Sequence, residues 1–149
     1  MRNLPILLLI ASSALVVGQQ TPAPQNPCEE RPISQFQMDK CADFQFKRAD
    51  ARLDKVYGNA LKRMSDDLAR AENRGDKTQM QYEQTAIAGL KDAERAWLSY
   101  RDIQCKAAGQ QYEGGSMAPM IYSQCLTTIT EHRIADLKSI YEDGDQKLE

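Results

Sequence analysis

From Ser34 onward, apolar side chains recur every three or four positions, which is the period of an amphipathic helix. The members of this first stripe are Cys41, Phe44, Ala49, Leu53, Val56, Tyr57, Ala60, Leu61, Met64 and Leu68. Ser34 with Gln37 matches a capping box at the start, and Gly75 predicts the end. Because an unbroken helix of about 40 residues would be about 60 Å long, we expect a break or bend near Cys41.

A second helical stretch follows, which Asp76 and Gln79 can open and Gly109 can end. Its apolar stripe is expected to comprise Ala86, Leu90, Ala93, Trp97, Tyr100 and Cys105. The next residues, 110–116, are polar and contain two consecutive glycines, which predicts a loop.

Ser116 can cap a third helix, which tolerates Pro119 in its first turn and continues toward Gly144. The helical pattern is continued by Met120, Cys125, Leu126, Ile129, Arg133, Leu137 and Ile140. No alternating pattern typical of a strand competes with these helices. Because short connections between long helices make neighbours antiparallel, the fold class is all-α: an elongated three-helix up-down antiparallel bundle.

The first 18 residues carry one positive charge, a hydrophobic run of about 14 residues and then small residues, the parts of a secretory signal peptide. The run is too short to suit a membrane-spanning anchor. We therefore expect cleavage before Gln19, no stable membrane anchor afterwards, and a periplasmic or secreted chain. Residues 19–32 form a Pro-rich segment, residues 33–143 the helical domain and residues 144–149 a polar tail.

The chain has four cysteines, an even number that predicts two disulfides in an exported protein. Of the three possible pairings we favour Cys28–Cys41 and Cys105–Cys125, because each would join neighbouring segments across a bend. A zinc site with four cysteine ligands is the competing interpretation. It lacks the close cysteine pairs that such sites use, and we expect no metal.

The formal charge is −2, from 19 basic and 21 acidic residues, and becomes −3 once Arg2 is removed with the signal peptide. This balance argues against nucleic acid as a partner. The single histidine, His132, has no serine or cysteine partner recognisable from spacing, so nucleophilic catalysis is not indicated. We expect no catalytic residues and no cofactor.

The second and third helices carry a recognisable set of residues: Ala93, Arg95, Ala96, Trp97, Tyr100, Arg101, Asp102 and Cys105, then Gly114, Gly115, Ser116, Cys125, Leu126, Thr130 and Arg133. Upstream, Cys41, Ala42, Ala49, Asp50, Leu53 and Tyr57 fit the same pattern. Over about residues 28–141 the chain resembles the lysozyme inhibitor LprI-like family of small bacterial envelope proteins. The resemblance implies an exported helical protein and, for a characterised member, inhibition of lysozyme. Glu94 and Asp54 depart from it, standing where Gln and Asn are usual.

Within that motif, Trp97 and Tyr100 are predicted to pack in the core rather than to serve as exposed binding residues. A second group comprises the charged residues Arg95, Arg101, Asp102, Glu131 and Arg133. These residues are predicted to form surface ion pairs across the second and third helices rather than a functional surface.

The loop is the candidate inhibitory element, with Tyr112, Glu113, Gly114, Gly115 and Ser116 entering a lysozyme cleft. A constrained loop loses less entropy on binding. The alternative is a simple turn that needs glycine for its backbone conformation.

A different class of function is an envelope interaction or scaffold module that does not inhibit lysozyme. Phe44 and Phe46 are two residues apart and cannot share one helical face, so one of them is expected to be exposed. The partner is therefore lysozyme or another envelope protein, and the oligomeric state stays open.

Overall fold

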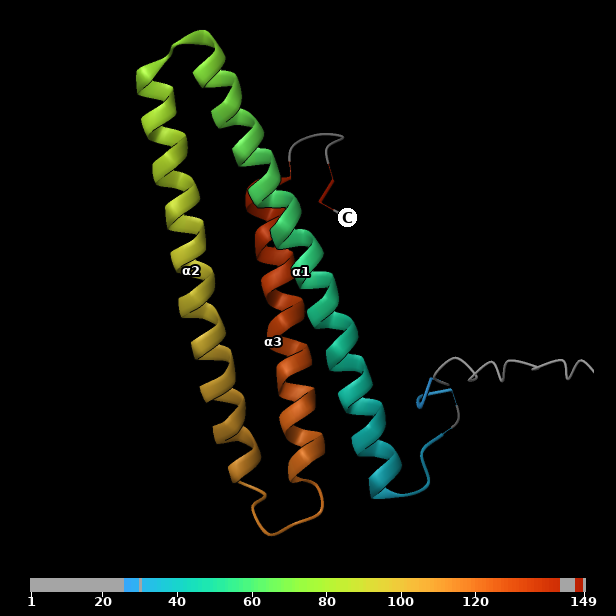
Figure 1. Cartoon of the computed structure of the whole chain (residues 1–149). Helices are drawn as coiled ribbons and strands as arrows, with labels where there is room; N and C mark the ends of the chain where they lie inside the picture. The colour runs from blue at the N-terminus through green and yellow to red at the C-terminus, as the bar shows by residue number, and fades with distance from the viewer. Residues whose placement is uncertain (1–25, 30, 143–146, 149) are drawn as a thin grey trace, which may run out of the picture.

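The computed structural model describes residues 26–29, 31–142 and 147–148, and the expected signal peptide lies outside them. Three helices make up this part of the chain: α1 (Gln35–Arg74), α2 (Lys77–Gln110) and α3 (Ala118–Tyr141). They run up, down and up as an elongated antiparallel bundle (Figure 1), which confirms the predicted fold class. None of these helices is long and apolar enough to cross a membrane.

Local signals set the ends of α1. Ser34 and Gln37 form the predicted capping box, and Gly75 caps the C-terminus in the left-handed conformation at φ 67°. Between them α1 is one helix of 40 residues, so the break expected near Cys41 is wrong. The helix continues because its long apolar stripe stays in contact with both neighbours, which replaces the stability that an isolated helix lacks.

The signals at the α2–α3 connection act differently from the prediction. Asp76 caps α2 through its side chain as expected, but α2 ends at Gln110 and α3 is preceded by Met117 without a side-chain cap. Ser116 is therefore not the cap. Gly109 is buried, and a Cβ there would lie 3.4 Å from the Cβ of Tyr122, so this glycine allows close approach of α2 and α3.

The core runs along the middle of the bundle. It consists of Leu53, Val56, Ala60, Met64, Leu90, Ile134, Leu137 and Leu148. Leu148 is 1% exposed although it belongs to the expected polar tail, and its carbonyl accepts a hydrogen bond from Asn59 Nδ2 at 3.0 Å. Because α3 is shorter than its neighbours, the α1–α2 hairpin extends past its C-terminal end (Figure 1).

Candidate functional site

The connection between α2 and α3 closes one end of the bundle (Figure 1), and each of residues 110–117 is exposed. Successive backbone hydrogen bonds shape it: Tyr112 N donates to Gly109 O, Glu113 N to Gln110 O, and Gly115 N to Tyr112 O, at 2.9 to 3.1 Å. Gly114 has φ 79°, a conformation that L side chains rarely adopt. The loop is therefore a compact series of turns, and Tyr112, 43% exposed, is its one aromatic ring.

Both predicted disulfides are present. Cys105–Cys125 joins α2 to α3 near the base of the loop, with its Cα atoms 5.4 Å apart, and Cys105 is fully buried. Cys28–Cys41 ties the segment before α1 to that helix. With all four cysteines oxidised, the four-cysteine zinc site is excluded. Among the described residues, no group of His, Cys, Asp and Glu could hold a metal ion.

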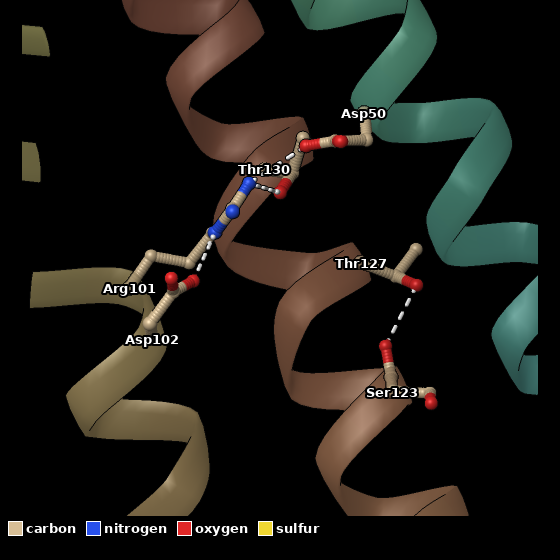
Figure 2. A network of polar contacts seen from close by, with 6 residues as sticks. All are labelled: Asp50, Arg101, Asp102, Ser123, Thr127 and Thr130. Carbon is tan, nitrogen blue, oxygen red and sulfur yellow. Dashed lines mark hydrogen bonds and ion pairs between the residues drawn. The ribbon is translucent and has the colours of Figure 1, made fainter. Parts of the chain in front are cut away.

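Arg101 is the centre of a polar network that connects all three helices (Figure 2). Its side chain is 9% exposed, and its Nη1 donates to Asp50 Oδ1 of α1 at 2.8 Å and to Thr130 Oγ1 of α3 at 3.5 Å. Its Nε donates to Asp102 Oδ1 at 3.0 Å. Burial acts to lower the pKa of Arg101, but the hydrogen bonds and charges of Asp102 and Asp50 outweigh it and raise the pKa. The guanidinium stays charged and holds the helices in register.

Trp97 lies between two arginines, as predicted for a packing residue rather than an exposed one. The guanidinium carbons of Arg101 and Arg133 lie 5.2 and 5.8 Å from its ring centroid. Tyr100 does not share this environment: it is 56% exposed, so its predicted place in the core is wrong. The core-facing line of α2 contains Arg101 instead. Consecutive residues of a helix point about 100° apart, so Tyr100 points away when Arg101 faces α1 and α3.

A second buried ion pair joins α2 to α3. Arg133 Nε and Nη2 both donate to Glu94 Oε2, at 3.0 and 2.9 Å, and the two side chains are only 13% and 9% exposed. The charges of this pair also act on Tyr57 of α1. Burial, and then the negative charge of Glu94, raise the pKa of Tyr57, whereas the positive charges of Arg95 and Arg133 act to lower it. Glu94, one of the two departures from the resemblance, thus has a defined partner.

The prediction of surface ion pairs across α2 and α3 is wrong, because the surface pairs of these residues form within α2 or between α1 and α3. Arg95 pairs with Asp92 on α2 itself, and Glu131 of α3 pairs with Arg52 of α1 at 2.7 Å. The pairs that link α2 to its neighbours are centred on the buried groups Arg101 and Glu94. Hydrophobic periodicity assigns charged residues to the solvent-facing side of a helix, so it did not predict these buried ion pairs. The recurrence of Leu90, Glu94, Arg101 and Cys105 on one helical face was the available signal.

The phenylalanines proposed for an interaction module are both half-buried. Arg48 covers Phe44 at 5.9 Å and Arg101 covers Phe46 at 5.4 Å, so the expectation that one of them is exposed is wrong. Phe36, near the start of α1, is the exposed ring of that helix at 69%.

A family model and a curated protein both match this chain over most of its length. The family model described as "Lysozyme inhibitor LprI" matches residues 28–137. The chain is also similar to "Uncharacterized protein R02472" of Rhizobium meliloti (strain 1021), with 37% identity over 141 residues that cover 95% of this chain and 96% of that protein. No solved structure matches. The matched residues contain α1, α2, all but the last turn of α3, both disulfides and the α2–α3 loop, and the chain belongs to the LprI lysozyme inhibitor family.

Proposed function

We propose that this protein is an exported inhibitor of lysozyme-type glycosidases that acts by blocking the substrate cleft. The observation that carries the proposal is the family match over residues 28–137, which cover nearly all of the helical domain. The family is one of inhibitors rather than enzymes. Two disulfides support an oxidising compartment, either the periplasm or the outside of the cell, where lysozyme is encountered. Export depends on the signal peptide expected over residues 1–18.

The loop formed by Tyr112, Glu113, Gly114, Gly115 and Ser116 is our proposed inhibitory element. It protrudes at the end of the bundle, and its turns are closed by backbone hydrogen bonds rather than by contacts that binding would break. A Cβ at Gly115 would lie 3.1 Å from Tyr112 O, so the loop is compact around Tyr112. Pre-organisation of this kind lowers the entropy that a segment loses when it enters a cleft.

Glycosidase clefts bind a row of sugar rings so that two catalytic carboxyl groups flank the bond to be cleaved. The flat ring of Tyr112 can occupy the place of a sugar, and the Ser116 hydroxyl can donate to a carboxylate. Glu113 and the acidic net charge favour encounter with the basic surface that many lysozymes present. The blockade needs no covalent step.

The first test is a cell-wall lysis assay with oxidised chain purified from the periplasm, against c-type, g-type and i-type lysozymes. We expect dose-dependent inhibition of at least one type, and Tyr112→Ala should raise the inhibition constant at least tenfold. Phe36→Ala is the matched control, because it removes an exposed ring from α1 at the same end of the bundle. An equal loss from Phe36→Ala would place the contact on α1 and overturn the loop mechanism. Full activity of every lysozyme type at micromolar excess would overturn the proposed function itself.

A second test addresses pre-organisation. The paired replacement Cys105→Ala and Cys125→Ala frees the base of the loop, whereas Cys28→Ala and Cys41→Ala removes a bridge from a different segment. Each pair should lower the unfolding free energy by about 3 kcal/mol, since the closed loops are of similar length. Only the first pair should weaken inhibition while circular dichroism still reports a folded helical chain.

A further inference from the structure

One side of α2 carries an apolar repeat of which all members but one are exposed. Eight positions spaced alternately by four and three residues are all apolar or glycine: Tyr82, Ala86, Gly89, Ala93, Ala96, Tyr100, Ile103 and Ala107. All but Ala86 are exposed, and the three large members, Tyr82, Tyr100 and Ile103, are exposed by 66%, 56% and 68%. We call these eight residues the outer seam.

The 4-3 spacing of the outer seam is the repeat of a coiled coil. It borders the face with which α2 packs in the bundle, which contains Leu90, Glu94, Arg101, Cys105 and Gly109. Ala86 also packs against the core, and the first four seam residues line an open groove with Met64 of α1 and Ile140 and Tyr141 of α3. The outer seam spans 26 residues, or about 38 Å of helix. A continuous exposed apolar strip of that length is typical of a protein contact surface rather than of scattered surface residues.

The order of large and small residues indicates what the outer seam contacts. In an antiparallel pair of identical α2 helices, layers form between residues whose numbers add to 189. Tyr82 then meets Ala107 of the second copy, Ile103 meets Ala86, and Tyr100 meets Gly89. Ala93 meets Ala96 in the central layer, next to the twofold axis. Every large side chain faces a small one, as close packing requires. A parallel pair would instead place each large side chain against its own copy.

Gly89 supports this arrangement independently. It lies inside an exposed helix, where glycine weakens the helix relative to alanine. Within the chain nothing lies within 4 Å of the position that a Cβ would occupy, so intramolecular packing does not require a glycine there. In the antiparallel pair, the ring of Tyr100 from the second copy fills that space.

We propose that the outer seam is a homodimer interface in which α2 pairs antiparallel with α2 of a second copy. The exposed residues Thr85, Asp92, Ser99 and Lys106 flank it on one side and supply the polar rim of such an interface. A strip about 38 Å long and one helix diameter wide covers on the order of 400 Å² per chain in projection. That area is below the range of stable interfaces, so we expect a weak, reversible dimer that forms only at high protein concentration. The twofold axis places the two α2–α3 loops at opposite ends, and both stay accessible.

Sedimentation equilibrium of the oxidised chain across about 1 to 200 µM tests the pair. We expect a monomer–dimer equilibrium, and Ala96→Glu should raise the dissociation constant more than tenfold, because it brings two carboxylates together beside the twofold axis. Ala88→Glu is the matched control, an exposed alanine of the same helix outside the outer seam, and should leave the constant unchanged. A monomer throughout the range, or a dimer that tolerates Ala96→Glu, would overturn the proposal.

The antiparallel register has its own test. Gly89→Leu should weaken the dimer at least tenfold, because leucine would occupy the space of Tyr100 from the second copy. Adding Tyr100→Ala should restore the constant to within about threefold, since the layer again holds one large and one small side chain. A dimer strengthened by Gly89→Leu would overturn this register. A monomeric protein that loses lysozyme inhibition through Ala96→Glu would assign the outer seam to lysozyme and refute the homodimer.

Discussion

The two faces of α2 reverse the usual distribution of side chains. The inner face buries Glu94 and Arg101, with 7% of each residue exposed, whereas the outer seam exposes Tyr100 and Ile103 by more than half. Both arginines on the inner side have carboxylate partners within hydrogen-bond distance, Arg101 with Asp50 and Arg133 with Glu94. Apart from Ala86, which packs against the core, the residues of the outer seam are exposed.

The difference shows that burial follows the available partners and not hydropathy alone. A charge buried without a partner is costly, but a paired and hydrogen-bonded one is tolerated and restricts how neighbouring helices can align. An apolar strip in water is unfavourable until another surface covers it. The inner face therefore satisfies its polar groups within one chain, whereas the outer seam is the face for which we propose a second copy as partner.

The strongest contrast is between two aromatic residues three positions apart. Trp97→Ala should lower the unfolding free energy by about 3 kcal/mol, because the indole packs against the core and both buried arginines. Tyr100→Ala should change it by no more than about 0.5 kcal/mol in the monomer. Denaturant unfolding of dilute protein measures both, and equal losses would contradict the assignment of the two faces.

Removal of the buried carboxylate comes next in size. Glu94→Ala should cost about 2 kcal/mol, since it leaves the guanidinium of Arg133 without its partner in a site where that side chain is only 13% exposed. Glu94→Gln should cost less, because the amide oxygen still accepts a hydrogen bond. Asp92→Ala removes an exposed ion pair with Arg95 and serves as the control, with a change below about 0.5 kcal/mol.

The two glycines of α2 are expected to give a smaller effect, and here substitution should raise the free energy of unfolding. Gly89→Ala should stabilise the dilute monomer by about 1 kcal/mol, because it improves helix propensity and the added methyl meets nothing within 4 Å. Gly109→Ala should gain less, since its methyl would lie 3.4 Å from the Cβ of Tyr122 on α3. Thermal unfolding of both variants at one protein concentration compares them; a larger gain at Gly109 would refute this explanation.

The smallest effect is a pH dependence that reports on the inner face. The folded-state pKa of Tyr57 lies above the ordinary value of 10.0, mainly through burial and then through Glu94. A raised folded pKa contributes stability that is present below pH 10 and is lost as the pH rises through the folded pKa. Tyr57→Phe should flatten that alkaline loss in denaturant titrations, with Tyr82→Phe on the outer seam as the control. If Tyr57→Phe lost stability with rising pH as steeply as the unmodified protein, this assignment of Tyr57 would be wrong.

Local signals in the sequence predicted most of the fold. The capping box at Ser34, the left-handed cap at Gly75 and both disulfides follow from short patterns, and the structure confirms each. The start of α3 was not predictable in this way. Ser116 has the right chemistry for a cap, but the turns of the loop place Met117 at that position.

The candidate site likewise contains one part that the sequence predicted and one that it did not. Exposure of the loop around Tyr112 could be expected from its polar composition and its glycines. The inner face could not, because Tyr100 and Arg101 are adjacent and hydropathy favours burial of the tyrosine. Only the packing of α1 and α3 reveals Asp50 and Thr130 as partners that make burial of Arg101 acceptable.

The sequence by itself determined three helices, their ends within a few residues, the disulfide pairs and the family, since each depends on contacts close in the chain or on a motif. The tertiary structure decided which face of α2 is inside. That choice depends on polar partners 29 and 51 residues away in the chain for Arg101 and on a carboxylate 39 residues away for Arg133. Their pairing energy exists only once the helices are packed and water is excluded.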